Sequence, residues 1–138
     1  MAAARREASF WILGALGGLA SLNGLTMMFA AEAWFQRVAA DTGPFNAHLV
    51  RDYGEAYLTA GLSLLGALRW PAWRAPFTTA AALILGLHAL AHVHEAAMGM
   101  RSFAGDLLGV HLPALVVAFY CVRFWRETSG DASGDGLQ

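Results

Sequence analysis

Residues 10–31, FWILGALGGLASLNGLTMMFAA, contain no charged side chain and decide the fold class of this chain. A helix that crosses a hydrocarbon core of ~30 Å needs about 20 consecutive, predominantly apolar residues. The stretch therefore predicts a transmembrane helix. Arg5 and Arg6 precede it, and its apolar run is too long for the core of a typical export signal, which favours an uncleaved first helix.

The composition of the whole chain agrees with a protein in lipid. Of its 138 residues, 57% are hydrophobic and 14% are charged, with one cysteine and no lysine among the basic residues. Soluble domains are nearer 45–50% apolar and about 25% charged. A disordered chain, a basic nucleic-acid-binding domain and a disulfide scaffold are therefore excluded, and the bilayer is the expected partner.

Three further stretches are candidate spans. Residues 75–97 are uncharged as far as His94, residues 107–125 are short but apolar, and residues 49–68 reach spanning length only by including charges near their start. We therefore predict an all-α integral membrane four-helix bundle over residues 1–126, followed by a disordered tail, 127–138. Three spans with a re-entrant segment is the alternative.

The arginines predict the orientation of the chain. With four spans, the arginines before the first span, between the second and third, and after the fourth fall on one side of the membrane. They are Arg5, Arg6, Arg69, Arg74, Arg123 and Arg126. Cytoplasmic loops carry an excess of arginine and lysine, so both termini are expected in the cytoplasm.

Small residues are frequent in the first span, where Gly14 and Gly18 form a G-x-x-x-G spacing that lets helices approach closely. Tight packing within one bundle is the favoured interpretation. A homo-oligomer, or contact with a subunit of a membrane complex through this span, is the alternative.

Ionisable residues within spans are costly, so each is a functional candidate. Two stripes share the spacing i, i+4, i+7, which places each on one helix face. With one histidine near the start of the last span, they make the predicted site near the outer face, which consists of His48, Asp52, Glu55, His88, His92, Glu95 and His111. Arg51 is expected to balance their charge.

Imidazole and carboxylate on neighbouring helices predict a transition-metal site for Zn, Fe, Mn or Cu. A b-type haem held by two histidines is a weaker alternative. A polar network without a cofactor is another, acting on a lipid-soluble substrate by acid–base chemistry or holding together a non-catalytic accessory subunit. Cys121 is alone, which excludes Fe–S clusters, and no motif supports a nucleophilic enzyme or a complete transporter.

The segment 43–58, GPFNAHLVRDYGEAYL, resembles small uncharacterised bacterial inner-membrane proteins that are similar to the DoxX-like family. The resemblance is strongest over residues 29–62. It implies a four-helix bundle in a bacterial inner membrane and carries no reaction. Within the segment, Gly43 and Pro44 predict a turn, and Asn46 is expected to cap the helix that follows.

Overall fold

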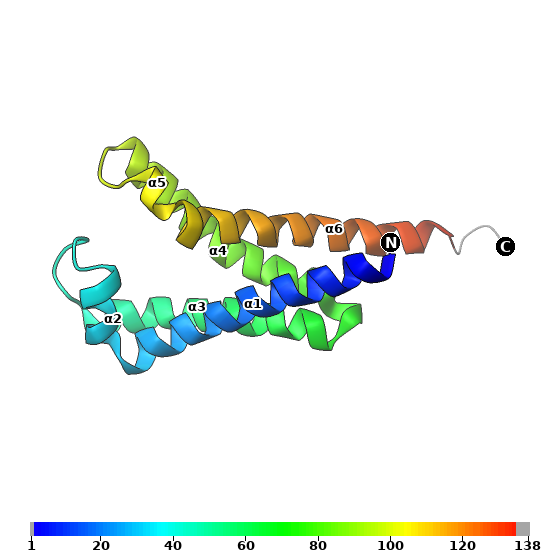
Figure 1. Ribbon diagram of the computed structural model, residues 1–138, viewed down its shortest axis with the longest axis horizontal. Coiled ribbons are helices and arrows are strands. Elements are labelled where there is room, and N and C mark those ends of the chain that lie inside the picture. Colours follow the sequence, from blue (N-terminus) through cyan, green and yellow to red (C-terminus); the bar gives the residue numbers. More distant parts are fainter. Residues whose placement is uncertain (1, 135–138) are drawn as a thin grey trace. The chain divides into compact units, whose positions relative to one another are not determined.

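The computed structural model describes residues 2–134, with side chains described over residues 7–130, and this part of the chain is helical with no β-strand (Figure 1). The elements are α1 (Ala2–Phe29), α2 (Ala31–Val38), α3 (Ala47–Arg69), the 3-10 turn η1 (Pro71–Trp73), α4 (Arg74–Ala97), α5 (Phe103–Asp106), the π-helical turn η2 (Leu107–His111) and α6 (Leu112–Gly134). They form two compact units, residues 1–65 and 66–138, which are described separately.

In the first unit, α1 and α3 approach closely through glycine. A side chain at Gly24 would meet the carbonyl oxygen of Gly54, and one at Gly17 would meet the carbonyl oxygen of Gly61, so the two helices are antiparallel. Gly18, by contrast, has no atom of the chain within 4 Å of such a position. The close approach therefore does not involve Gly18, one member of the predicted Gly14–Gly18 pair.

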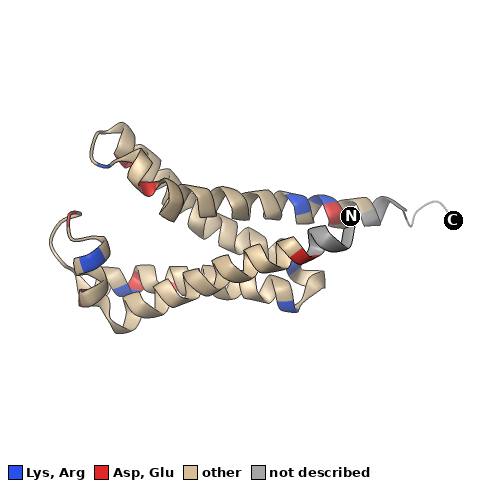
Figure 2. Ribbon diagram, in the orientation of Figure 1, with Lys and Arg blue, Asp and Glu red and all other residues tan. Residues whose placement is uncertain are grey.

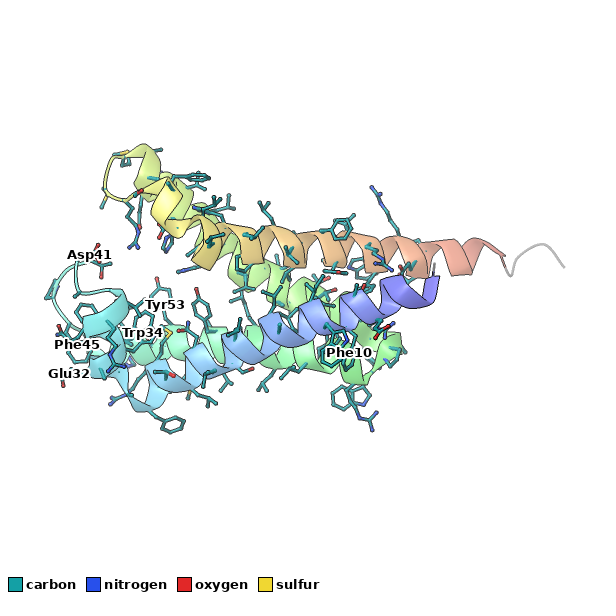
Figure 3. The ribbon with its side chains drawn as sticks, in the orientation of Figure 1. Phe10, Glu32, Trp34, Asp41, Phe45 and Tyr53 are labelled. Atoms are coloured by element: carbon teal, nitrogen blue, oxygen red, sulfur yellow. The ribbon has the colours of Figure 1, made fainter. Side chains whose placement is uncertain are left out.

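The short helix α2 packs back on the α1–α3 pair. Its Phe35 is buried with Met27 of α1 and Val50 of α3, and Trp34 is half-buried beside them. The indole N–H of Trp34, which is labelled in Figure 3, donates to Asn23 Oδ1 at 2.8 Å. The polar side chain of Asn23 in α1 is therefore satisfied by α2. A buried polar group without a partner is costly, and this bond fixes α2 at the end of α1.

The boundary between α2 and α3 follows the local sequence. α2 ends at Val38, and in the connection that follows Gly43 takes φ +133°, a conformation that favours glycine. The Asn46 carboxamide oxygen then accepts from the backbone N–H groups of His48 and Leu49, at 3.1 and 3.2 Å. The predicted cap of the second long helix is confirmed.

In the second unit, α4 and α6 form an antiparallel pair. At one end the Trp125 indole N–H donates to Thr79 Oγ1 at 2.8 Å, whereas at the other end His92 reaches the start of the last helical run. The side chains on the buried face of α4 are mostly small, and those on the buried face of α6 are mostly larger. They are Ala75, Thr78, Ala81, Leu85 and Ala89 on α4, and Ala114, Val117, Tyr120 and Phe124 on α6.

Three helical segments of the described chain are long and apolar enough to cross a membrane, namely Glu7–Phe29, Pro71–Ala97 and Phe103–Gly130. Within the most apolar 18-residue stretch of each segment, only 22–28% is buried inside the protein, so most of each helix is exposed to the surroundings of the chain. Charged residues are concentrated near helix ends (Figure 2). The prediction of an all-helical chain with several possible spans is confirmed at this level.

The last helix continues beyond the predicted boundary of the membrane domain. Residues 127–134, expected to belong to a disordered tail, are helical, and residues 135–138 lie outside the described part of the chain. The local hydrogen bonds explain the difference. Arg123 pairs with Glu127 one turn later at 2.8 Å, and the hydroxyls of Thr128 and Ser129 donate to the Trp125 carbonyl oxygen.

Candidate functional site

The stripe on α3 is open to solvent. His48 Nδ1 lies 3.4 Å from Asp52 Oδ1, with side chains that are 88% and 53% exposed, and Glu55 is exposed as well. An exposed i, i+4 pair contributes little to stability. Arg51 is also exposed, and no ion pair within the described residues involves it. The first unit thus brings together two of the predicted site residues, His48 and Asp52, at close range.

The stripe on α4 is more enclosed and has partners from outside its helix. The rings of His88 and His92 are neighbours, with centroids 4.5 Å apart. His92 Nδ1 lies 2.8 Å from Asp106 Oδ2, and these two side chains are 13% and 14% exposed. The bond joins the last turns of α4 to the short helix α5, so it ties together the two ends of the connecting loop.

Arg101 completes this arrangement from the loop. Its guanidinium holds both oxygens of Asp106, with Nε 3.2 Å from Oδ2 and Nη2 3.4 Å from Oδ1. Glu95 is a weaker neighbour, with Oε2 3.8 Å from Arg101 Nε. One guanidinium thus faces two carboxylates, so the side chains of Glu95, Arg101 and Asp106 together carry a net charge of −1.

The loop that carries these groups is shaped by local signals. Gly99 takes φ +72°, which a side chain would strain, and ends the α4 segment. Ser102 then caps α5, since its hydroxyl accepts from the Gly105 backbone N–H at 3.2 Å. These two features place Arg101 and Asp106 over the end of α4.

His111 occupies a distinct position in the same unit. It ends the π-helical turn η2, is only 5% exposed, and stacks on the Phe103 ring with centroids 4.4 Å apart. Pro113 accounts for the wide turn, because a proline ring clashes with the carbonyl four residues earlier. His111 Nε2 is buried and has no hydrogen-bond partner in the described chain.

Asp106 and Arg101 were not among the residues predicted for the site. The stripes were recognised by their spacing on single helices, whereas these two groups reach His92 from a loop and a four-residue helix. The available signal was their place in the short connection after His92 and Glu95, where charged side chains must lie close to the end of α4.

Among the residues that the structure describes, no group of three or more His, Cys, Asp or Glu side chains is arranged to hold a metal ion. The donors that lie together on α4 are two imidazoles, of which one is oriented by a carboxylate. Metal-binding histidines commonly donate their other ring N–H to such a carboxylate. This donor set suits an open site with exchangeable ligands and does not form a closed structural centre.

No family model matches this chain. Neither the curated proteins nor the solved structures contain a significant match to it. The class of the protein therefore follows from its own features, which are long apolar helices and a His–Asp–Arg cluster at one end of the α4–α6 pair.

Proposed function

We propose that the chain is a four-span protein of a bacterial inner membrane, with α3 as the second span and both termini in the cytoplasm. The arginines support this topology. If only α1, α4 and α6 crossed the membrane, the start of α4 and the end of α6 would both lie on the side opposite the N-terminus. The arginines there would then face away from Arg5 and Arg6, against the usual bias; they are Arg69, Arg74, Arg123 and Arg126. The close antiparallel packing of α3 on α1 also suits two neighbouring spans.

Reporter fusions test this topology. A fluorescent protein that folds in the cytoplasm is expected to be bright when fused after Gln138, and a phosphatase that needs export is expected to be inactive there. A fusion in the loop near Thr42 should give the reverse result. An exported C-terminus would contradict the four-span proposal.

Within this membrane protein, we propose that His88 and His92 bind a transition-metal ion at an open site near the outer face. The observation that carries the proposal is the 2.8 Å contact between His92 Nδ1 and Asp106, beside the ring of His88. The contact leaves His92 Nε2 as the ring nitrogen for a ligand, and Asp106 is itself held by Arg101. Residues four apart on a helix lie on the same face, so their imidazoles can approach one ion.

The residues present fit a transition-metal ion only at an open site, in which the protein supplies some of the ligands and leaves other positions vacant. Imidazole suits Zn, Cu and Fe, and the positions that the protein leaves vacant would be filled by water or by a lipid-soluble substrate. An ion there would act as a Lewis acid on an oxygen atom of that substrate. The protein's own part is to orient His92, through Asp106 and Arg101, and to supply Glu95 as a nearby carboxylate.

A titration with Co²⁺ in detergent tests the proposal, because the visible bands of the ion report nitrogen ligands. We expect His92→Ala and His88→Ala to abolish the bands, and Asp106→Asn to weaken binding by about 10–100-fold. His94→Ala is the matched control, since His94 is an exposed histidine on the same helix. Equal loss in this control, or unchanged binding in His92→Ala, would contradict the metal proposal.

Two other results would redirect the assignment. A Soret band in the purified protein that is lost in His92→Ala would indicate haem in place of a simple ion. A protein that binds no Co²⁺, in which Asp106→Asn only lowers stability, would favour the accessory or structural subunit, with the cluster acting to hold the loop in place.

A further inference from the structure

The end of the second unit opposite to His92 carries a different polar surface. The Trp125–Thr79 hydrogen bond places the start of α4 beside the late part of α6. Residues 66–79 and 119–130, which meet at this end, contain four arginines and a single carboxylate. The arginines are Arg69, Arg74, Arg123 and Arg126, and the carboxylate is Glu127.

A hollow on α6 lies within this basic end. It is lined by Phe119, Val122, Arg123, Arg126 and Glu127, whose spacing places them on one helix face. The side chains of α6 that pack on α4 lie elsewhere, and Phe119 and Val122 are 62% and 51% exposed. The hollow is therefore apolar on the side toward the middle of α6 and basic toward its end.

The charges in the hollow are unequal. Glu127 pairs with Arg123 at 2.8 Å. Arg126 is exposed, and no ion pair within the described chain takes up its charge. The two other arginines add to the positive field but bind within the protein, since Arg74 donates to the Ala67 carbonyl oxygen and Arg69 lies over the Trp70 ring. Within the hollow, Arg126 is therefore the arginine available to an external anion.

Aromatic side chains set the depth of this surface in a membrane. Trp70, Trp73 and Trp125 are each about half exposed at the same end of the unit. Exposed tryptophans are enriched at the level of the lipid headgroups, where their rings are apolar and their N–H groups polar. Arg126 would therefore lie among phosphates, with Phe119 and Val122 one to two turns deeper.

We propose that this hollow binds an anionic phospholipid of the phosphatidylglycerol class. The phosphodiester accepts from the guanidinium of Arg126, with Arg123 beside it, and an acyl chain lies along Phe119 and Val122. A zwitterionic headgroup is disfavoured because its cation meets the same positive field. The proposal does not depend on the metal site, which lies at the other end of the α4–α6 pair.

Native mass spectrometry of the purified protein measures this binding, with phosphatidylglycerol or phosphatidylcholine added to the detergent. We expect retained phosphatidylglycerol to exceed phosphatidylcholine, and Arg126→Gln to weaken phosphatidylglycerol binding about fivefold. Arg126→Lys should keep most of the binding, because it keeps the charge. Comparison of Arg126→Lys with Arg126→Gln also distinguishes an effect of the lost positive charge from an effect of misfolding.

The control variant is Arg37→Gln, which removes an exposed arginine of α2 from the first unit. It should leave the binding unchanged, and Phe119→Ala should reduce it in the presence of intact Arg126. Equal retention of the two lipids would overturn the proposal. Equal weakening by Arg37→Gln and Arg126→Gln would also overturn it, since net charge alone would then explain the preference.

Discussion

Replacement of Gly24 by alanine tests whether backbone contact between α1 and α3 holds the first unit together. A Cβ atom at this position would lie 2.5 Å from the backbone nitrogen of Leu58 and 2.6 Å from the Gly54 carbonyl oxygen. Both neighbours are backbone atoms, so no side-chain rotation can relieve the overlap. The helices would have to move apart, with loss of the contacts on either side.

The expected magnitude follows from two opposing effects. Overpacking of a close interface costs about 1–3 kcal/mol. Alanine in place of an unconstrained helical glycine gains about 0.5–1 kcal/mol. Gly18, in the same helix, has open space around its Cβ position and shows the gain alone. The gain applies to both positions and cancels in the comparison, so the free energies of unfolding of Gly24→Ala and Gly18→Ala should differ by about 1–3 kcal/mol.

Unfolding of the purified protein by dodecyl sulfate in mixed micelles, followed by far-ultraviolet circular dichroism, measures these differences. The single-cysteine background allows the same transition to be followed by the reactivity of Cys121. If Gly24→Ala were as stable as Gly18→Ala, the close antiparallel contact of α1 with α3 would be refuted, and with it one support for α3 as a span.

Substitutions at three further positions probe other hydrogen bonds, each measured by the same unfolding assay. Asp106→Asn should cost about 1.5–3 kcal/mol, because charge-assisted bonds are lost at a mostly buried carboxylate; an unchanged midpoint would refute the His92–Asp106 link. Asn46→Ala should cost about 1 kcal/mol through loss of the helix cap, and Asn46→Ser should restore most of it. Trp34→Phe keeps the ring but leaves Asn23 Oδ1 without its donor, which should cost about 0.5–1.5 kcal/mol; a null effect would show that water replaces the indole.

Much of the helical framework could be predicted because it depends on local features. The uncharged run after Ser9 requires no partner to be recognised as a span, and Asn46 caps its helix through bonds to the next residues. The i, i+4 spacing of His88 and His92 also gave their proximity correctly. In each case one element contains the whole signal.

Other features depend on contacts between helices, and the spacing of residues along one helix does not predict which residues of another helix they meet. The indole of Trp34 bonds to Asn23 of the preceding helix, a contact that the sequence of neither helix indicates. Gly17 and Gly24 approach α3 whereas Gly18 does not, because the face in contact is set by the partner helix. The helical residues after Arg126 were missed for a similar reason, since side-chain bonds offset their low apolar content.

The cluster of His92, Arg101 and Asp106 shows why the few charged side chains of this chain lie close together. A mostly buried carboxylate in an apolar protein needs a cation or donor close by, and Asp106 obtains both from Arg101 and His92. Once Arg101 neutralises Asp106, the carboxylate can orient the imidazole without leaving an isolated buried charge. His92 is then fixed in position, with its second ring nitrogen directed by the same bond. A purely structural ion pair between Arg101 and Asp106 would not require a histidine, nor a second imidazole next to it. Charge balance alone therefore does not explain why two histidines lie together on α4, and this is the reason to test the end of α4 for a ligand.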